Sequence, residues 1–204
     1  MISNGIYLVL NDVWGLVKLN FMFLAFSLLG GVVLGVGPAM LMVNDLILEY
    51  RLQSQQITWR EGFERWKANF IRGNQIFYLY VLISAVLIYN LYICVQIKGL
   101  AWLILSFLLL FFTFMIGMVF LYMININSSF EISIVNLFKL SFATVFLNLG
   151  TFIKLITMIG LVLFLSWKMK GLLLFMTFSG LLFLTTLVIK KQVAHVRLQL
   201  IGHE

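Results

Sequence analysis

The residues of this chain that could carry out chemistry are few and widely separated. Both histidines, His195 and His203, lie near the C-terminus, and the single cysteine, Cys94, lies within a hydrophobic run. They offer neither the spacing of metal ligands nor a thiol pair for a disulfide. The sequence contains no Walker A motif and no nucleophile elbow. We therefore predict that the protein is not an enzyme, with no catalytic residue, no metal site and no cofactor.

Two carboxylates, Asp45 and Glu49, are spaced one helical turn apart. We interpret them as solvated or as paired with Arg51. No Asp or Glu lies inside any of the long apolar runs described next, and this pattern disfavours a carboxylate relay for protons or sodium.

The composition is that of an integral membrane protein. Of the 204 residues, 63% are hydrophobic and 10% are charged. A water-soluble domain is about 45–50% apolar and about 25% charged, so a soluble or disordered chain is excluded. Because the backbone must satisfy its own hydrogen bonds in lipid, we expect an all-α bundle of transmembrane helices that forms a single membrane domain over residues 1–204.

Five apolar runs are long enough to cross a bilayer, which takes about 17–25 residues of helix. We predict spans over residues 20–43, 76–97, 101–123, 151–167 and 172–189. Residues 1–18 are less apolar and place Ile2, Ile6, Val9, Val13 and Leu16 at helical spacing. They predict an interfacial helix that leads into the first span.

The distribution of Lys and Arg predicts the orientation. Nine cations fall on one side of the five predicted spans: Arg51, Arg60, Arg65, Lys67, Arg72, Lys139, Lys190, Lys191 and Arg197. Four fall on the other side: Lys18, Lys98, Lys168 and Lys170. The remaining cation, Lys154, lies near the inner end of the fourth predicted span. The positive-inside bias then puts the N-terminus outside and the C-terminus in the cytoplasm. The formal charge of +7 points to anionic membrane lipids as partners and not to nucleic acid.

Two cytoplasmic amphipathic segments, 58–72 and 128–147, each begin with a possible capping box. Thr58 is followed by Glu61 and Ser128 by Glu131, the spacing at which a hydroxyl caps a helix and a glutamate reaches back. The order of span, amphipathic helix and span thus occurs twice, and an internal duplication stays open. The alternative is that residues 134–149 form a sixth span.

The first amphipathic segment carries an aromatic face formed by Phe63, Trp66 and Phe70, with Asn69 beside it. We predict these four residues as a partner-docking site. Burial of the same face in the lipid headgroup region is an equally good interpretation, because aromatic residues with flanking cations suit both.

Small residues recur along the first predicted span at Ser27, Gly31, Gly35 and Ala39. Such a stripe lets a second helix approach closely, either within this bundle or from a partner. Gly37 and Pro38 should kink the helix near its end. We predict these six residues as a helix-packing site.

Several of these features together resemble the YesL-like family of bacterial integral membrane proteins, a domain of unknown function. The features are Asn20, the Gly37-Pro38-Ala39 sequence, Arg51, and the segment from Trp59 through Trp66 to Asn69 and Phe70. Where that family has Lys-Gln after the Asn-Phe pair, this chain has Ile71-Arg72-Gly73, and its second half matches in pattern only.

The resemblance implies a multi-pass protein of the bacterial cell membrane. YesL-like proteins are commonly encoded beside carbohydrate importers of the ATP-binding-cassette (ABC) type. We therefore expect a noncatalytic accessory or regulatory subunit whose partners are the permease subunits of such an importer and possibly their ATPase. The alternatives are an independent small-solute transporter or channel, and a membrane scaffold or assembly factor for another complex.

Overall fold

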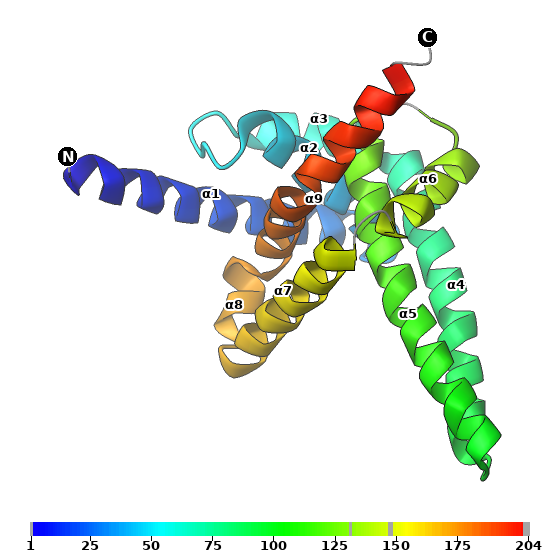
Figure 1. The fold of residues 1–204 in the computed structure, drawn as a ribbon. Coiled ribbons are helices and arrows are strands. Elements are labelled where there is room, and N and C mark those ends of the chain that lie inside the picture. The colour runs from blue at the N-terminus through cyan, green and yellow to red at the C-terminus, as the bar shows by residue number, and fades with distance from the viewer. Residues whose placement is uncertain (1, 131, 147–148, 202–204) are drawn as a thin grey trace.

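A computed structural model describes residues 2–130, 132–146 and 149–201 of the chain. Over these ranges the backbone forms helices and no strand, so the all-α prediction is confirmed (Figure 1). The helices are α1 Ile2–Leu29, α2 Val36–Tyr50, α3 Trp59–Ala68, α4 Phe70–Gln96, α5 Leu100–Asn127, α6 Ile134–Phe146, α7 Leu149–Lys168, α8 Gly171–Phe175 and α9 Thr177–Ile201.

Four of these helices contain a stretch that is long and apolar enough to cross a membrane. The stretches are Leu10–Leu29 in α1, Phe70–Gln96 (α4), Leu100–Asn127 (α5) and Gly150–Lys168 in α7. These apolar helices fit a multi-pass membrane protein. Helix α6 has 13 residues, Ile134–Phe146, and residues 147–148 of the sixth span considered over 134–149 lie outside the described residues, so that alternative stays open.

The predicted single span over 20–43 is wrong, and so is its separation from a helix over 1–18. Helix α1 is continuous to Leu29, and the chain then turns and runs back as α2. Gly35 packs against Ser27 near the turn, and Gly15 packs against Leu52 at the other end, so α1 and α2 form an antiparallel hairpin.

The turn of this hairpin depends on backbone that favours glycine. Gly31 has a φ of 69°, and Val32 follows with a φ of 65°, both in the left-handed region. A continuous helix cannot accommodate such residues, so the helix ends. The apolar side chains of Leu28, Leu29 and Val33 are exposed around the turn.

The predicted span over 172–189 is also divided. The short helix α8 ends at Phe175, and α9 begins at Thr177 after a break at Met176. The structure shows what satisfies the backbone there, because the side chain of Asn20 on α1 reaches into the break.

Asn20 is fully buried and binds both sides of this break. Its Nδ2 donates to the carbonyl oxygens of Leu173 and Leu174, at 3.1 and 2.7 Å. Its Oδ1 accepts from the backbone amides of Phe178 and Ser179, at 2.9 and 3.2 Å. One amide side chain therefore pairs four backbone groups that a continuous helix would pair itself.

The two predicted amphipathic segments differ in how well the sequence predicted their helix starts. Thr58 caps α3 as expected, accepting from the amide of Glu61 at 3.3 Å. Ser128, in contrast, lies at the C-terminal end of α5, and the hydroxyl of Ser133 accepts from the Asn136 amide at the start of α6. The predicted capping box at Ser128 is therefore wrong, because the next helix begins at Ile134 and Ser133 provides the hydroxyl at its start. Glu131, its other member, lies outside the described residues.

Helices α4 and α5 form a long antiparallel pair whose outer half, residues 82–114, we call the α4–α5 arm. Figure 1 shows this arm extending away from the other helices. Many of its apolar side chains are more than half exposed: Leu82, Val86, Tyr89, Leu103, Phe107 and Phe114. The inner halves of the pair join α1, α2 and α9 around a buried core that includes Met42, Leu46, Tyr122 and Met123.

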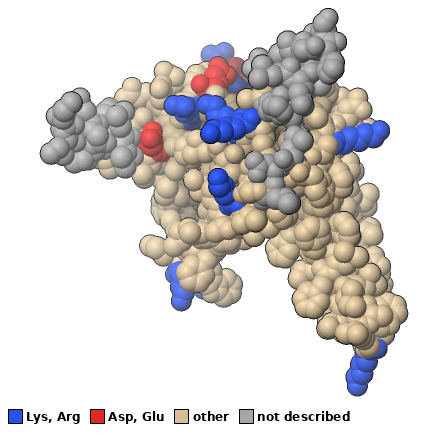
Figure 2. All heavy atoms as spheres, viewed as in Figure 1, with Lys and Arg blue, Asp and Glu red and all other residues tan. Residues whose placement is uncertain are grey.

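Charged side chains gather mainly at one end of the molecule. Figure 2 shows Lys, Arg, Asp and Glu together over the end where Figure 1 places α3 and the C-terminal part of α9. Lysines also mark the tip of the α4–α5 arm, which carries Lys98, and the α7–α8 turn, which carries Lys168 and Lys170. We call the end of the molecule that carries α3 and the C-terminal part of α9 the charged end.

Candidate functional site

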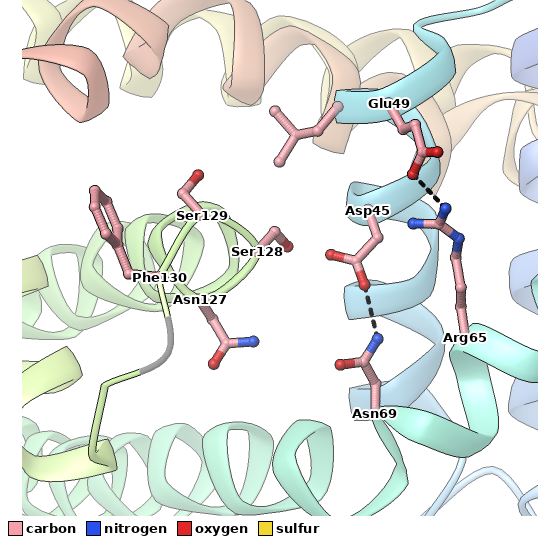
Figure 3. A pocket seen from close by; sticks show the side chains of 9 residues that line it. Asp45, Glu49, Arg65, Asn69, Asn127, Ser128, Ser129 and Phe130 are labelled. Carbon is pink, nitrogen blue, oxygen red and sulfur yellow. Dashed lines mark hydrogen bonds and ion pairs between the residues drawn. The ribbon is translucent and has the colours of Figure 1, made fainter. Parts of the chain in front are cut away.

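A polar cavity of about 590 Å³ opens at the charged end. It lies between α2, the junction of α3 and α4, and the C-terminal end of α5 (Figure 3). Its walls carry carboxylates, a guanidinium, amides, hydroxyls and one aromatic ring. The lining residues are Asp45, Leu48, Glu49, Arg65, Asn69, Asn127, Ser128, Ser129 and Phe130.

One wall contains an ion-pair network centred on Arg65. Its guanidinium binds Glu49 on α2 and Glu61 on its own helix, the latter at 2.8 Å. The predicted pairing of Glu49 with Arg51 is therefore wrong, since Arg65 is the arginine that reaches it, while Glu49 is exposed as the other alternative expected. The hydrogen bond from Arg65 holds the pKa of the Glu49 carboxyl below its usual value.

Asp45 occupies a different environment one turn away. Its Oδ2 accepts from the Asn69 Nδ2 at 2.7 Å, and its other oxygen faces the Ser128 side of the cavity (Figure 3). Burial raises the pKa of the Asp45 carboxyl, although hydrogen bonds from Ser128 and Asn69 oppose that shift. Among the described residues no salt bridge joins Asp45 to a cation.

A buried network of amides and hydroxyls lies behind the cavity and connects α2, α5 and α9. The Thr186 hydroxyl lies 3.1 Å from the Asn44 Oδ1 and 2.9 Å from the Asn125 Oδ1. Asn44 also donates to the Ser128 hydroxyl at 2.9 Å. Because these groups are buried together, they fix the cavity wall on the core.

The rear of the cavity wall is fixed by Arg72 at the start of α4. Its Nε donates to the Asn127 Oδ1 at 2.7 Å, and its guanidinium also binds the Ile132 carbonyl oxygen. Arg72 thereby ties α4 to the end of α5 and to the segment that leads into α6. The contact orients Asn127 at the cavity.

The structure separates the four residues predicted as a docking site. Asn69 points inward to Asp45, while Trp66 stacks on Phe26 of α1 and meets Phe70 edge to face, with ring centroids 6.1 and 5.1 Å apart. Phe63 is 45% exposed. All four thus contact the chain itself, since the Phe63 ring lies 6.2 Å from Phe26 and 6.1 Å from Trp66, but Phe63 keeps nearly half of its surface exposed. Docking at this site stays a prediction.

A further exposed aromatic residue of α3, Trp59, was missed in the sequence. It is 49% exposed and lies on the same helix as Phe63. Its position directly after the Thr58 cap was the available signal. The outward aromatic surface of α3 therefore consists of Trp59 and Phe63.

The predicted helix-packing residues do not form one stripe, because the chain turns between them. Gly35 lies so close to Ser27 that a Cβ atom would overlap its backbone, and Gly37 makes the same kind of contact with Gly73 of α4. Gly31 belongs to the turn, where a Cβ atom would meet nothing within 4 Å. Pro38 and Ala39 are buried in α2, and Pro38 contacts Gly73.

Residues 16–91 match the profile of a family described as a protein of unknown function, DUF624. The matched region runs from α1 into α4 and contains Asp45, Glu49, Arg65 and Asn69, while the cavity residues of α5 lie beyond it. All the residues on which the YesL-like resemblance rests before Ile71 also fall inside it. No curated protein and no solved structure matches the chain. The first part of the chain is thus similar to a domain of unknown function.

Proposed function

We propose that this chain is a noncatalytic accessory membrane subunit of a bacterial carbohydrate importer of the ABC type, as its YesL-like resemblance implies. The observation that carries the proposal is the α4–α5 arm, a long helix pair that leaves an extended apolar surface uncovered by the rest of the chain. In a membrane such a surface is available to the helices of a partner.

The placement of polar groups supports an accessory role over independent transport. A transporter needs polar groups that face a pathway near the middle of the bilayer. Three polar side chains of the α4–α5 arm bond to the backbone of their own helix. Asn90 donates to the Val86 carbonyl, Ser106 to Trp102 and Thr113 to Leu109, each four residues earlier. Asn90, in the middle of its predicted span, therefore serves its own helix.

The membrane orientation that goes with this proposal differs from the one expected from five spans. Lys18 donates to the Ser54 carbonyl oxygen at 3.0 Å, so it lies with the α2–α3 segment. Counting Lys18 on the cytoplasmic side changes the Lys/Arg distribution from nine against four to ten against three. We propose that the α1–α2 hairpin enters the membrane with its apolar turn and returns, and that α4, α5, α7 and the α8–α9 segment cross it, which leaves both termini on the cytoplasmic side.

The surface formed by Trp59 and Phe63 is the second element of the proposal. It lies beside the charged end, where a cytoplasmic ATPase or the inner loops of a permease would approach. Aromatic anchors at interfaces often contribute about 2 kcal/mol or more each, equivalent to about thirtyfold in affinity.

Purification from native membranes in mild detergent tests the proposal. Mass spectrometry should find permease and ATPase subunits co-eluting with the wild-type chain. A double variant, Trp59→Ala with Phe63→Ala, should lose most of them. Because both rings also pack on Phe26, an unfolding midpoint close to that of wild type is needed to show that α3 stays in place. Trp167→Ala, which truncates an exposed tryptophan at the end of α7, is the matched control and should retain them. A self-sufficient particle without importer subunits would favour an independent transporter, and subunits of another complex would favour a scaffold.

A further inference from the structure

The cavity at the charged end contains more negative than positive charge. Arg65 is shared by Glu49 and Glu61, so one guanidinium serves two carboxylates. Asp45 makes a third carboxylate, and the side chains that bind it, Asn69 and Ser128, are neutral. Among the residues that line the cavity, Asp45 and Glu49 are negative and Arg65 is positive, so the lining has a formal excess of one negative charge.

Burial makes this position unfavourable for the Asp45 carboxylate, and the charge of Arg65 acts in the opposite direction. A carboxylate removed from water loses hydration free energy, and neutral hydrogen-bond donors replace only part of it. A proton or a bound cation would offset this loss of hydration free energy. The raised pKa of the Asp45 carboxyl is the expected result of the loss.

We propose that this cavity binds an ammonium or guanidinium group, with Asp45 as its ion-pair partner. The Ser129 hydroxyl lies on the wall formed by the end of α5 and supplies a further acceptor, while the Ser128 hydroxyl already accepts from Asn44 (Figure 3). The Phe130 ring lies at the same wall and can cover the apolar stem of such a cation. A volume of about 590 Å³ is within the range of small-ligand sites, about 300–1,000 Å³.

The donor set fits an organic cation better than a metal ion. Among the described residues, no three His, Cys, Asp or Glu side chains come together as metal ligands. Glu49 is already engaged by Arg65, which leaves Asp45 as the carboxylate turned toward the open cavity. A single carboxylate surrounded by hydroxyls and amides suits N–H donors.

One cation of α9, Lys190, lines a second cavity of about 200 Å³. The two cavities share Leu48 and Ser129 as lining residues. Lys190 is exposed, and its ammonium could compete with an external cation. Removing it should therefore leave binding intact or strengthen it.

Thermal unfolding of the purified chain in detergent tests the proposal, with n-butylammonium and n-propylguanidinium chlorides as probes. A ligand that binds the folded state raises the unfolding midpoint in a saturable way. Sodium chloride at equal ionic strength controls for screening. Wild type, Asp12→Asn and Lys190→Gln should respond, and Asp45→Asn should lose at least tenfold in apparent affinity. Asp12→Asn is the matched control, because Asp12 is exposed on α1 away from the cavity.

A second variant keeps the proposal testable if Asp45→Asn does not fold. Ser129 is exposed at the cavity wall, and Ser129→Arg would place a guanidinium opposite Asp45. This variant should unfold at a higher temperature than wild type and should no longer respond to either probe.

Short basic peptides separate the two sources of the cation. Tighter binding of an acetylated Gly-Lys-Gly or Gly-Arg-Gly peptide than of the small probes would assign the site to a basic side chain of a partner. Tighter binding of the small probes would assign it to a free organic cation. The proposal is overturned if no probe gives a saturable response beyond that of sodium chloride, or if Asp45→Asn responds like wild type.

Discussion

Gly37 of α2 and Gly73 of α4 lie backbone against backbone where their helices cross. A Cβ atom on Gly37 would overlap the Gly73 carbonyl group, and one on Gly73 would lie 2.5 Å from the Pro38 nitrogen. This contact sets the distance between the hairpin and the first helix of the α4–α5 pair. It thereby fixes α2, which carries Asp45 and Glu49, beside the α3–α4 junction.

Replacing either glycine should therefore destabilise the bundle. We expect Gly37→Ala or Gly73→Ala to lower the free energy of unfolding by about 1–3 kcal/mol, because the two backbones must move apart. Thermal unfolding in detergent measures the loss. Gly117→Ala and Gly160→Ala are matched controls, since a Cβ atom there meets nothing within 4 Å. Equal midpoints for all four variants would mean that the crossing is looser than described.

Asn20 should be among the most sensitive polar residues of the chain. Asn20→Ala leaves two carbonyls and two amides at the α8–α9 break without their side-chain partner. Each unpaired buried group costs about 1–3 kcal/mol, and partial relaxation should keep the total loss at about 2–4 kcal/mol. Asn90→Ala is the control, because that exposed amide bonds only to its own helix, and it should be near neutral. A neutral Asn20→Ala would show that the break is satisfied in another way.

The Gly37–Gly73 crossing and the break bound by Asn20 show what the sequence could and could not predict. Apolar length predicted helices α4, α5 and α7, and the Thr58–Glu61 spacing predicted the cap of α3, because both are local properties. The run over 20–43 is apolar without interruption, so its reversal was hidden, and Gly30, Gly31 and Gly35 were the only signal. The partner of Asn20 lies more than 150 residues away, beyond any local pattern.

The cavity was missed for a similar reason. The spacing of Asp45 and Glu49 placed both on one helix face, but it could not show that Arg65, 16 residues beyond Glu49, returns to it. The wall formed by Ser128 and Ser129 comes from the end of α5, which the sequence had assigned to the start of another helix. The cavity is therefore formed by contacts between different helices, which the spacing of residues along the sequence does not reveal.

Cysteine labelling should decide the orientation of the α1–α2 hairpin. Single cysteines at Asp12, Gln56 and Lys98 on a Cys94→Ala background report on α1, the α2–α3 segment and the tip of the arm. An impermeant reagent should label Asp12→Cys and Gln56→Cys from the same, cytoplasmic side and Lys98→Cys from the opposite side. Labelling of the first two from opposite sides would restore a crossing by α1.

The pH dependence of stability should report on Asp45. Its pKa is raised in the folded state above the unfolded value of about 3.9. Between these two values the folded chain binds more protons, so Asp45 lowers the free energy of unfolding as pH rises. The destabilisation is complete above the folded pKa. Glu49, with its lowered pKa, contributes in the opposite direction and is common to wild type and variant.

Asp45→Asn should therefore gain in unfolding temperature relative to wild type as the pH rises from about 4, and the gain should level off above the folded pKa. Unfolding scans of both proteins across this interval measure it. A difference between the two midpoints that stays constant with pH would contradict a raised pKa at Asp45.

Photo-crosslinking from the α4–α5 arm in intact cells tests the accessory-subunit proposal most directly. A photoreactive residue at Phe107, which is 66% exposed, should form an adduct with a permease subunit of an ABC importer, identified by mass spectrometry. The same residue at Leu121, buried in the inner half of α5, should give adducts within the chain only. Adducts of Phe107 with lipid or with copies of this chain, and none with an importer subunit, would contradict the proposal.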